Sequence, residues 1–174
     1  TYGLGCDIYA RRTIDRIYQL KGMNEKQRLS FLCSDLSEVA RYAVLENRNY
    51  RILRHHVPGR YTFILPATRE VPKILQSNAH TVGIRIPESP VAQALVRELG
   101  HPIISTTVGR TVDGDGAYTN DPDEVVRMFG RSIDVLLDGG PLYGEPSSVI
   151  DLTGDAPTIV RQGSGDLTWL ASAM

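Results

Sequence analysis

The feature that most constrains the fold of this chain is the order in which short apolar runs and helical patterns follow one another. Runs of strand length alternate with amphipathic stretches, but several strand-like runs also follow one another with no helical pattern between them. Parallel neighbours need a crossover connection, so this order excludes a purely parallel, doubly wound sheet. The sequence predicts an α+β fold with a twisted mixed sheet flanked by helices. The chain is expected to begin at the end of a strand that runs into a glycine turn within 1–7. The other expected strands are 29–33, 61–65, 81–87, 101–105, 133–138, 147–153 and 158–163, and the expected helices are 13–20, 35–41, 50–56, 90–99, 121–129 and 167–170.

Helix-end signals support these assignments. Pro90 at the first helical position and Gly100 just after the last one bound the clearest helix of the chain. Asp35 followed by Glu38 is the spacing of a capping box. Thr13 is the expected N-cap of the helix 13–20.

Composition describes an ordinary globular protein. The 174 residues are expected to form one domain, 1–174, with 41% hydrophobic and 22% charged residues. The net charge of -1 argues against a broadly basic nucleic-acid coat. Cys6 and Cys33 lack a CxxC or Cys/His spacing and are expected to be buried free thiols in a reducing compartment. No apolar run approaches the roughly 18 residues of a membrane span, so the expected location is the cytoplasm without membrane contact.

The common catalytic and metal-binding motifs are missing from the sequence. The four histidines have no metal-ligand spacing, and no serine lies in GxSxG. The DGDG stretch, 113–116, lacks the remaining ligands of a calcium loop and is expected to be a flexible turn. No Walker loop occurs either, so a bound nucleotide would be held by separate side chains.

Polar side chains of that kind stand at the ends of predicted strands and helices. They are Lys21, Arg85, Ser105, Thr106, Thr107, Ser147, Ser148 and Arg161. Each has an ordinary explanation alone, such as a helix-end lysine or a turn-forming hydroxyl. Together they predict a polar, cationic cleft along one sheet edge, suited to phosphate and carboxylate groups.

The order of these pieces resembles the YrdC-like (TsaC) family from end to end. The segments that carry the resemblance are YGLGCD (2–7), IYQLKG (17–22), PGRYTFIL (58–65), VGIRIPESP (82–90), HPIISTT (101–107), LDGG (137–140), SSVIDLT (147–153) and IVRQG (159–163). The resemblance implies a concave substrate cleft and a nucleotidyltransferase. The reaction is threonylcarbamoyl-adenylate synthesis from L-threonine, bicarbonate and ATP for the threonylcarbamoyladenosine modification of tRNA. It also implies that a helix and most of a strand precede Thr1 in family members.

The resemblance assigns roles to six residues. It implies phosphate contacts for Lys21, in the place of the lysine of a K-x-R motif, and nucleotide contacts for Thr81 and Arg161. It implies that Arg85 lies near the threonine carboxylate. Thr107 stands in the place of the serine of the family's S-x-N motif, and Ser147 stands in the place of the serine of its S-T-V-[VI]-D motif. The resemblance implies that both residues bind threonine. Lys21 and Arg161, with Mg²⁺ carried by the nucleotide, would neutralise phosphate charge; no metal site made of protein side chains is expected.

Two departures shift the resemblance towards the YciO branch of the family. Met23 stands where K-x-R has its arginine, and Gly109 stands where S-x-N has its asparagine. The sequence therefore predicts a weakened synthase. Two alternatives stay open: a protein that binds tRNA or double-stranded RNA through the same cleft, and an enzyme that acts on a related acyl-adenylate.

Overall fold

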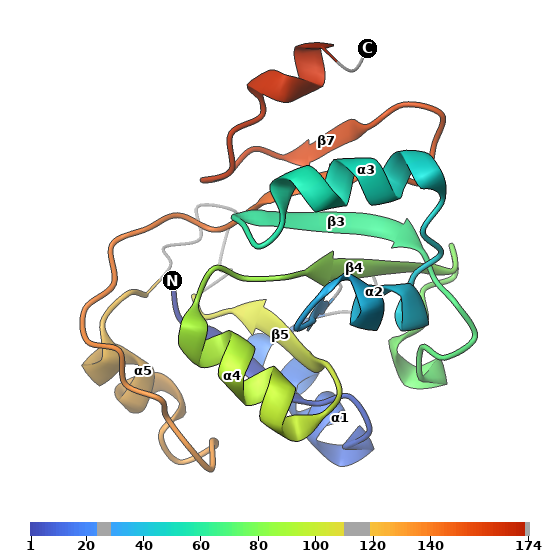
Figure 1. Ribbon diagram of the computed structural model, residues 1–174. Coiled ribbons are helices and arrows are strands. Elements are labelled where there is room, and N and C mark those ends of the chain that lie inside the picture. The colour runs from blue at the N-terminus through green and yellow to red at the C-terminus, as the bar shows by residue number, and fades with distance from the viewer. Residues whose placement is uncertain (24–28, 110–118, 173–174) are drawn as a thin grey trace.

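The computed structural model describes residues 1–23, 29–109 and 119–172, and in that part of the chain one seven-stranded sheet carries the other elements (Figure 1). The strands are β1 (Gly3–Asp7), β2 (Ser30–Leu32), β3 (Tyr61–Pro66), β4 (Thr81–Arg85), β5 (Ile103–Thr107), β6 (Ser148–Asp151) and β7 (Thr158–Arg161). Their order is β1-β5-β2-β4-β3-β6-β7. The pairs β2–β4 and β3–β6 are parallel and the others antiparallel. The predicted α+β class with a twisted mixed sheet is confirmed.

Strand register gives the sheet two unlike faces. One row of paired positions is almost entirely large and apolar: Cys6, Ile104, Phe31, Ile84, Phe63 and Ile150. In the next row all residues except Ile64 are small or polar: Gly5, Ser105, Ser30, Gly83 and Ile64. Because successive side chains of a strand point to opposite faces, the first row forms a core face and the second a polar face.

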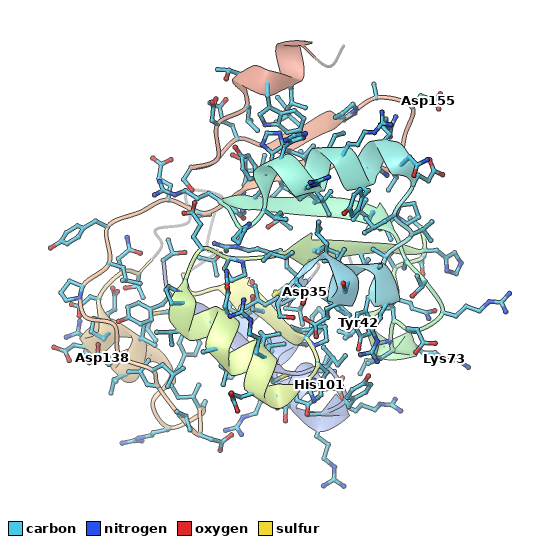
Figure 2. All side chains as sticks on the ribbon, in the orientation of Figure 1. Asp35, Tyr42, Lys73, His101, Asp138 and Asp155 are labelled. Atoms are coloured by element: carbon cyan, nitrogen blue, oxygen red, sulfur yellow. The ribbon has the colours of Figure 1, made fainter. Side chains whose placement is uncertain are left out.

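Helices flank the sheet. They are α1 (Arg11–Lys21), α2 (Leu36–Tyr42), α3 (Asn47–His56), α4 (Pro90–Leu99) and α5 (Pro122–Phe129), with the 3-10 helices η1 (Lys73–Leu75) and η2 (Thr168–Ser172). Figure 1 shows α2, α3 and α4 on the viewer's side of the sheet. Tyr42 of α2, labelled in Figure 2, packs against Phe31 with ring centroids 5.5 Å apart. Val39 and Leu53 are fully buried in the same core.

The predicted helix ends are confirmed where capping chemistry was clear. The side chain of Asp35 accepts the N–H of Glu38 at 2.9 Å, and the Glu38 carboxylate accepts the N–H of Ser34 at 2.6 Å. Helix α4 starts at Pro90 and ends before Gly100, which has a φ of 76° that favours glycine.

Two predicted features are wrong. Thr13 is not an N-cap, because α1 begins at Arg11 and the Thr13 N–H already bonds to the carbonyl of Ala10. Residues 133–138 form no strand. Ile133 and Leu136 pack against the core, whereas Val135 is 72% exposed. The inward side chains are thus three residues apart, and a strand would need a spacing of two.

The remaining sequence expectations concern thiols, membranes and metals. Both cysteines are free; burial raises the pKa of Cys6 to about 11 and that of Cys33 well above its usual value. Within the described residues, no helix is long and apolar enough to cross a membrane. Among the same residues no cluster of histidine, cysteine or carboxylate side chains could hold a metal ion. The DGDG turn lies outside the described ranges.

Candidate active site

A cleft of about 230 Å³ opens on the polar face of the sheet, and residues of all seven strands or their immediate flanks line it. Among the described residues, its lining side chains carry two guanidinium groups, eight aliphatic hydroxyls and no carboxylate. The hydroxyls belong to Thr1, Ser30, Thr62, Thr81, Ser105, Thr106, Thr107 and Ser147. The prediction of a polar, cationic cleft agrees with this geometry, but its predicted place along one sheet edge is wrong. Strands distant in sequence pair side by side, which brings their polar positions onto one face.

Arg85 lines the cleft from β4, the fourth of the seven strands in sheet order. It lies on β4 between Ile84 and Ile86, which are 1% and 2% exposed, so its side chain points to the opposite face, as the alternation predicts. Its Nε atom is buried and has no hydrogen-bond partner among the described residues. Burial lowers the pKa of Arg85, and the positive charge of Arg161 lowers it further. A buried donor without a partner is costly, which makes this guanidinium a strong anion-binding group.

Arg161 ends β7 at the mouth of the cleft, where its side chain remains largely exposed. Its Nε and Nη2 atoms donate to the carbonyl oxygen of Ser147 at 3.3 and 2.7 Å. Neither Arg161 nor Arg85 forms an ion pair with a carboxylate in the part of the chain that the structure describes. The two like charges therefore leave a positive region that an anion can neutralise.

Ser147 and Thr62 form a buried hydroxyl pair in the cleft. Their oxygens lie 2.8 Å apart, and the residues are only 4% and 6% exposed. One hydroxyl donates to the other, so one hydroxyl hydrogen remains to bind a group in the cleft. Thr62 is a site residue that the sequence reasoning missed, although the alternation of YTFIL puts it on the face opposite Phe63.

Thr81 and Thr107 also line the cleft. The Thr81 hydroxyl lies 3.1 Å from that of Ser77, whose oxygen also accepts the Thr81 N–H at 2.8 Å. Ser77 is 4% exposed and was not predicted, since it follows a 3-10 turn that no sequence pattern marked. Thr107 pairs with Gly3 at the end of β5.

Of the side chains predicted for the cleft, Lys21 and Ser148 do not line it; Lys21 is the one of these two that the resemblance gave a role. At the C-terminus of α1, its Nζ atom donates to the carbonyl oxygens of Thr107 and Gly109 at 3.0 and 2.6 Å. Burial lowers its pKa. The lysine thus lies beside the cleft, bound to the backbone of the segment that carries Thr107. Met23, two residues on, is half-buried and packs against the core.

Comparison with known proteins places this geometry in a family. The model of the Sua5, YciO and YrdC proteins, described as "Telomere recombination", matches residues 1–163. The chain belongs to the Sua5/YciO/YrdC family. The predicted resemblance to YrdC-like proteins, including the YciO branch, is confirmed.

Relatives in this family include both YciO and synthase sequences. The uncharacterized protein YciO of Escherichia coli K12 is 38% identical over 167 residues, covering 95% of this chain and 80% of that protein. A threonylcarbamoyl-AMP synthase of Nitrosococcus oceani is 33% identical over 139 residues, covering 79% of this chain and 74% of the synthase.

Solved structures of the family have the same fold. The crystal structure of E. coli YciO has a TM-score of 0.89 at 37% identity, covering 96% of this chain and 81% of that one. P. abyssi Sua5 complexed with L-threonine also has a TM-score of 0.89, covering 99% of this chain and 51% of that one. At 24% identity, this second likeness shows the fold alone.

Proposed function

We propose that this chain is a nucleotidyltransferase that makes threonylcarbamoyl-adenylate from L-threonine, bicarbonate and ATP in the cleft of the polar face. Family membership and a synthase relative at 33% identity support the reaction class. The observation that carries the proposal is the pair of guanidinium groups, Arg85 and Arg161, in a cleft whose described lining residues include hydroxyls and no carboxylate. Such a lining suits two anionic substrates, because the phosphates of ATP and the carboxylate of threonine are both neutralised by guanidinium groups.

In this proposal the six residues divide between the two substrates. Lys21, Thr81 and Arg161 bind the nucleotide, and Arg85, Thr107 and Ser147 bind threonine. An ammonium group has three donors, and two carbonyls already hold Lys21, so its third N–H would reach a phosphate oxygen. Arg161 uses Nε and Nη2 for Ser147 and keeps other donors for the nucleotide.

The proposed chemistry needs no protein nucleophile. Bicarbonate loses hydroxide to give CO₂, the amine of threonine attacks the CO₂ to form a carbamate, and the proton that the amine loses combines with the hydroxide as water. A carbamate oxygen then attacks the α-phosphate of ATP. The new O–P bond forms as the bond from the α-phosphorus to the bridging oxygen breaks, and pyrophosphate leaves with the electron pair. The protein contributes alignment of the two substrates and stabilisation of phosphate charge by Lys21 and Arg161.

Magnesium fits this proposal only as part of the nucleotide. The described residues place no carboxylate in the cleft lining and hold no cluster that would bind a metal ion. Any Mg²⁺ would therefore be carried on the phosphates of ATP. The adenylate would serve tRNA modification in the cytoplasm, which makes tRNA a later acceptor and not an occupant of the cleft.

Pyrophosphate release from the whole protein tests the proposal when threonine and bicarbonate are each omitted in turn. We expect release only when both are present with ATP. Release without threonine would mean plain ATP hydrolysis. Binding of ATP without release of pyrophosphate would favour a related acyl-adenylate as substrate, an alternative consistent with Met23 and Gly109.

A titration with tRNA tests the RNA-binding alternative. If the protein binds tRNA through its phosphates, the affinity should weaken steeply with added salt.

A further inference from the structure

The turn that follows β7 wraps around the start of β6. The N–H of Gly163 donates to the hydroxyl oxygen of Ser148 at 3.0 Å, and that hydroxyl donates to the carbonyl of Gly165 at 2.8 Å. The N–H of Ser164 donates to the carbonyl of Pro146 at 2.9 Å. Three successive residues of the turn are therefore bonded to the segment 146–148.

Ser148 is the centre of this contact. Its side chain is 0% exposed, and its hydroxyl uses both its donor and its acceptor capacity on the turn. Removal of the hydroxyl would leave the N–H of Gly163 and the carbonyl of Gly165 without these partners, in a place where water has little access.

Glycine allows the turn to approach this closely. A Cβ atom on Gly163 would overlap the carbonyl oxygen of Pro146, and one on Gly165 would lie 2.6 Å from the Tyr61 ring. Two backbones are thus in direct contact with no side chain between them. The sequence marks this stretch only as a glycine-rich turn after Arg161.

Arg161 stands two residues before Gly163, and its guanidinium donates to the carbonyl of Ser147, the neighbour of Ser148. Ser147 therefore holds the guanidinium and Ser148 holds the turn, and these two residues are adjacent at the start of β6. A long side chain such as Arg161 loses rotamer freedom when it binds a ligand, and its hydrogen bonds to the Ser147 carbonyl already restrict part of that freedom before binding.

We propose that Ser148 is a positioning residue that fixes the turn 163–165 against β6 and so holds Arg161 at the mouth of the cleft. This inference rests on the proposed nucleotide contact of Arg161. Ser148 itself touches neither substrate; it acts through the backbone of the turn.

The matched pair Ser148→Thr and Ser148→Val tests the proposal, because the two side chains have nearly the same shape and differ in the hydroxyl. By calorimetry we expect ATP affinity to fall roughly 5- to 20-fold in the valine variant relative to the threonine variant. The same comparison in an Arg161→Ala background should show less than about a twofold difference, since the effect passes through Arg161. An equal loss in both backgrounds, or no loss in either, overturns the proposal.

Amide hydrogen exchange of Gly163 tests the same claim without any substrate. Exchange in the valine variant should be at least about tenfold faster than in the threonine variant. Equal protection would overturn the role of Ser148, whatever the ligand results. Faster exchange combined with an Arg161→Ala variant that binds ATP normally would instead reject the proposed nucleotide site and leave the contact between turn and strand intact. If the valine variant does not fold, Ser148→Ala takes its place in both measurements.

Discussion

The two faces of the sheet are made by the same strands, yet they differ in what they contribute. On β4, Ile84 is buried against the helices, whereas its neighbours Gly83 and Arg85 line the cleft. The core face gains stability from apolar burial. The polar face keeps hydroxyl and guanidinium groups available, and the described residues that line the cleft include no carboxylate to neutralise them. Substitutions on the first face should therefore change mainly the free energy of unfolding, and substitutions on the second mainly ligand binding.

The largest expected effect is on the core face. Phe63 is 0% exposed, and Phe63→Ala should lower the free energy of unfolding by about 3–5 kcal/mol, because it removes apolar contacts and leaves a cavity. Urea denaturation measures this change. Val135→Ala is the control, since Val135 is 72% exposed and should lose less than about 0.5 kcal/mol. A loss below about 1 kcal/mol in Phe63→Ala would remove the distinction between the faces.

The second effect concerns the two departures from the synthase motifs. Met23→Arg with Gly109→Asn should restore a charged contact and a neutral one, and raise the rate of adenylate formation by roughly 10²–10³-fold if both strengthen in the transition state. Single-turnover formation of the adenylate compares the double variant with the natural chain. Because Met23 packs against the core, Met23→Gln is the control, since it removes the apolar contact without adding a charge. A natural chain as fast as the double variant would show that other groups already supply the charge.

A smaller effect is expected for the two cationic side chains that are proposed to bind the nucleotide. Lys21→Ala and Arg161→Ala should each weaken ATP binding by about 1.5–3 kcal/mol, the usual contribution of a charge-assisted hydrogen bond. Calorimetry measures both, with Arg54→Ala on the exposed surface of α3 as the control. If both variants bind ATP as the natural chain does, the nucleotide assignment is wrong.

The smallest effect is a pH dependence that comes from Lys21. Burial lowers the pKa of Lys21 from its ordinary value of 10.5, so the ammonium loses its proton at a lower pH than a surface lysine does. ATP affinity should therefore fall as the pH rises towards 10.5 and should begin to fall before an ordinary lysine titrates. Lys21→Arg stays charged throughout this range and should abolish that part of the decline. An identical pH profile in the arginine variant would mean that Lys21 does not bind ATP as a cation.

Sequence alone predicted the chemistry of the cleft better than its position. The alternation Ile84-Arg85-Ile86 was enough to place Arg85 opposite the core, since strand periodicity is local. The lateral order of the strands is not local, which is why the cleft was expected at an edge instead of on a face. Thr62 was missed because a threonine within a strand has an ordinary structural explanation.

Lys21 shows a different limit of sequence reasoning. Its place at the end of α1 was predicted, and Gly22 with a φ of 58° ends that helix. Its contacts with the carbonyls of Thr107 and Gly109 depend on how α1 packs against β1, the strand that pairs with β5, and no motif encodes that packing. The roles of all six site residues stay predictions, to be decided by the binding experiments.

Arg85→Met tests the central claim most directly, because one substitution reports on both properties of the polar face. Urea denaturation measures the free energy of unfolding, and calorimetry measures threonine affinity in the same variant. Since the buried Nε has no partner in the described residues and Arg161 repels the guanidinium, the variant should be as stable as the natural chain or more stable, and should lose threonine binding by roughly tenfold or more. A variant that is destabilised like a core residue while threonine binds unchanged would contradict the account.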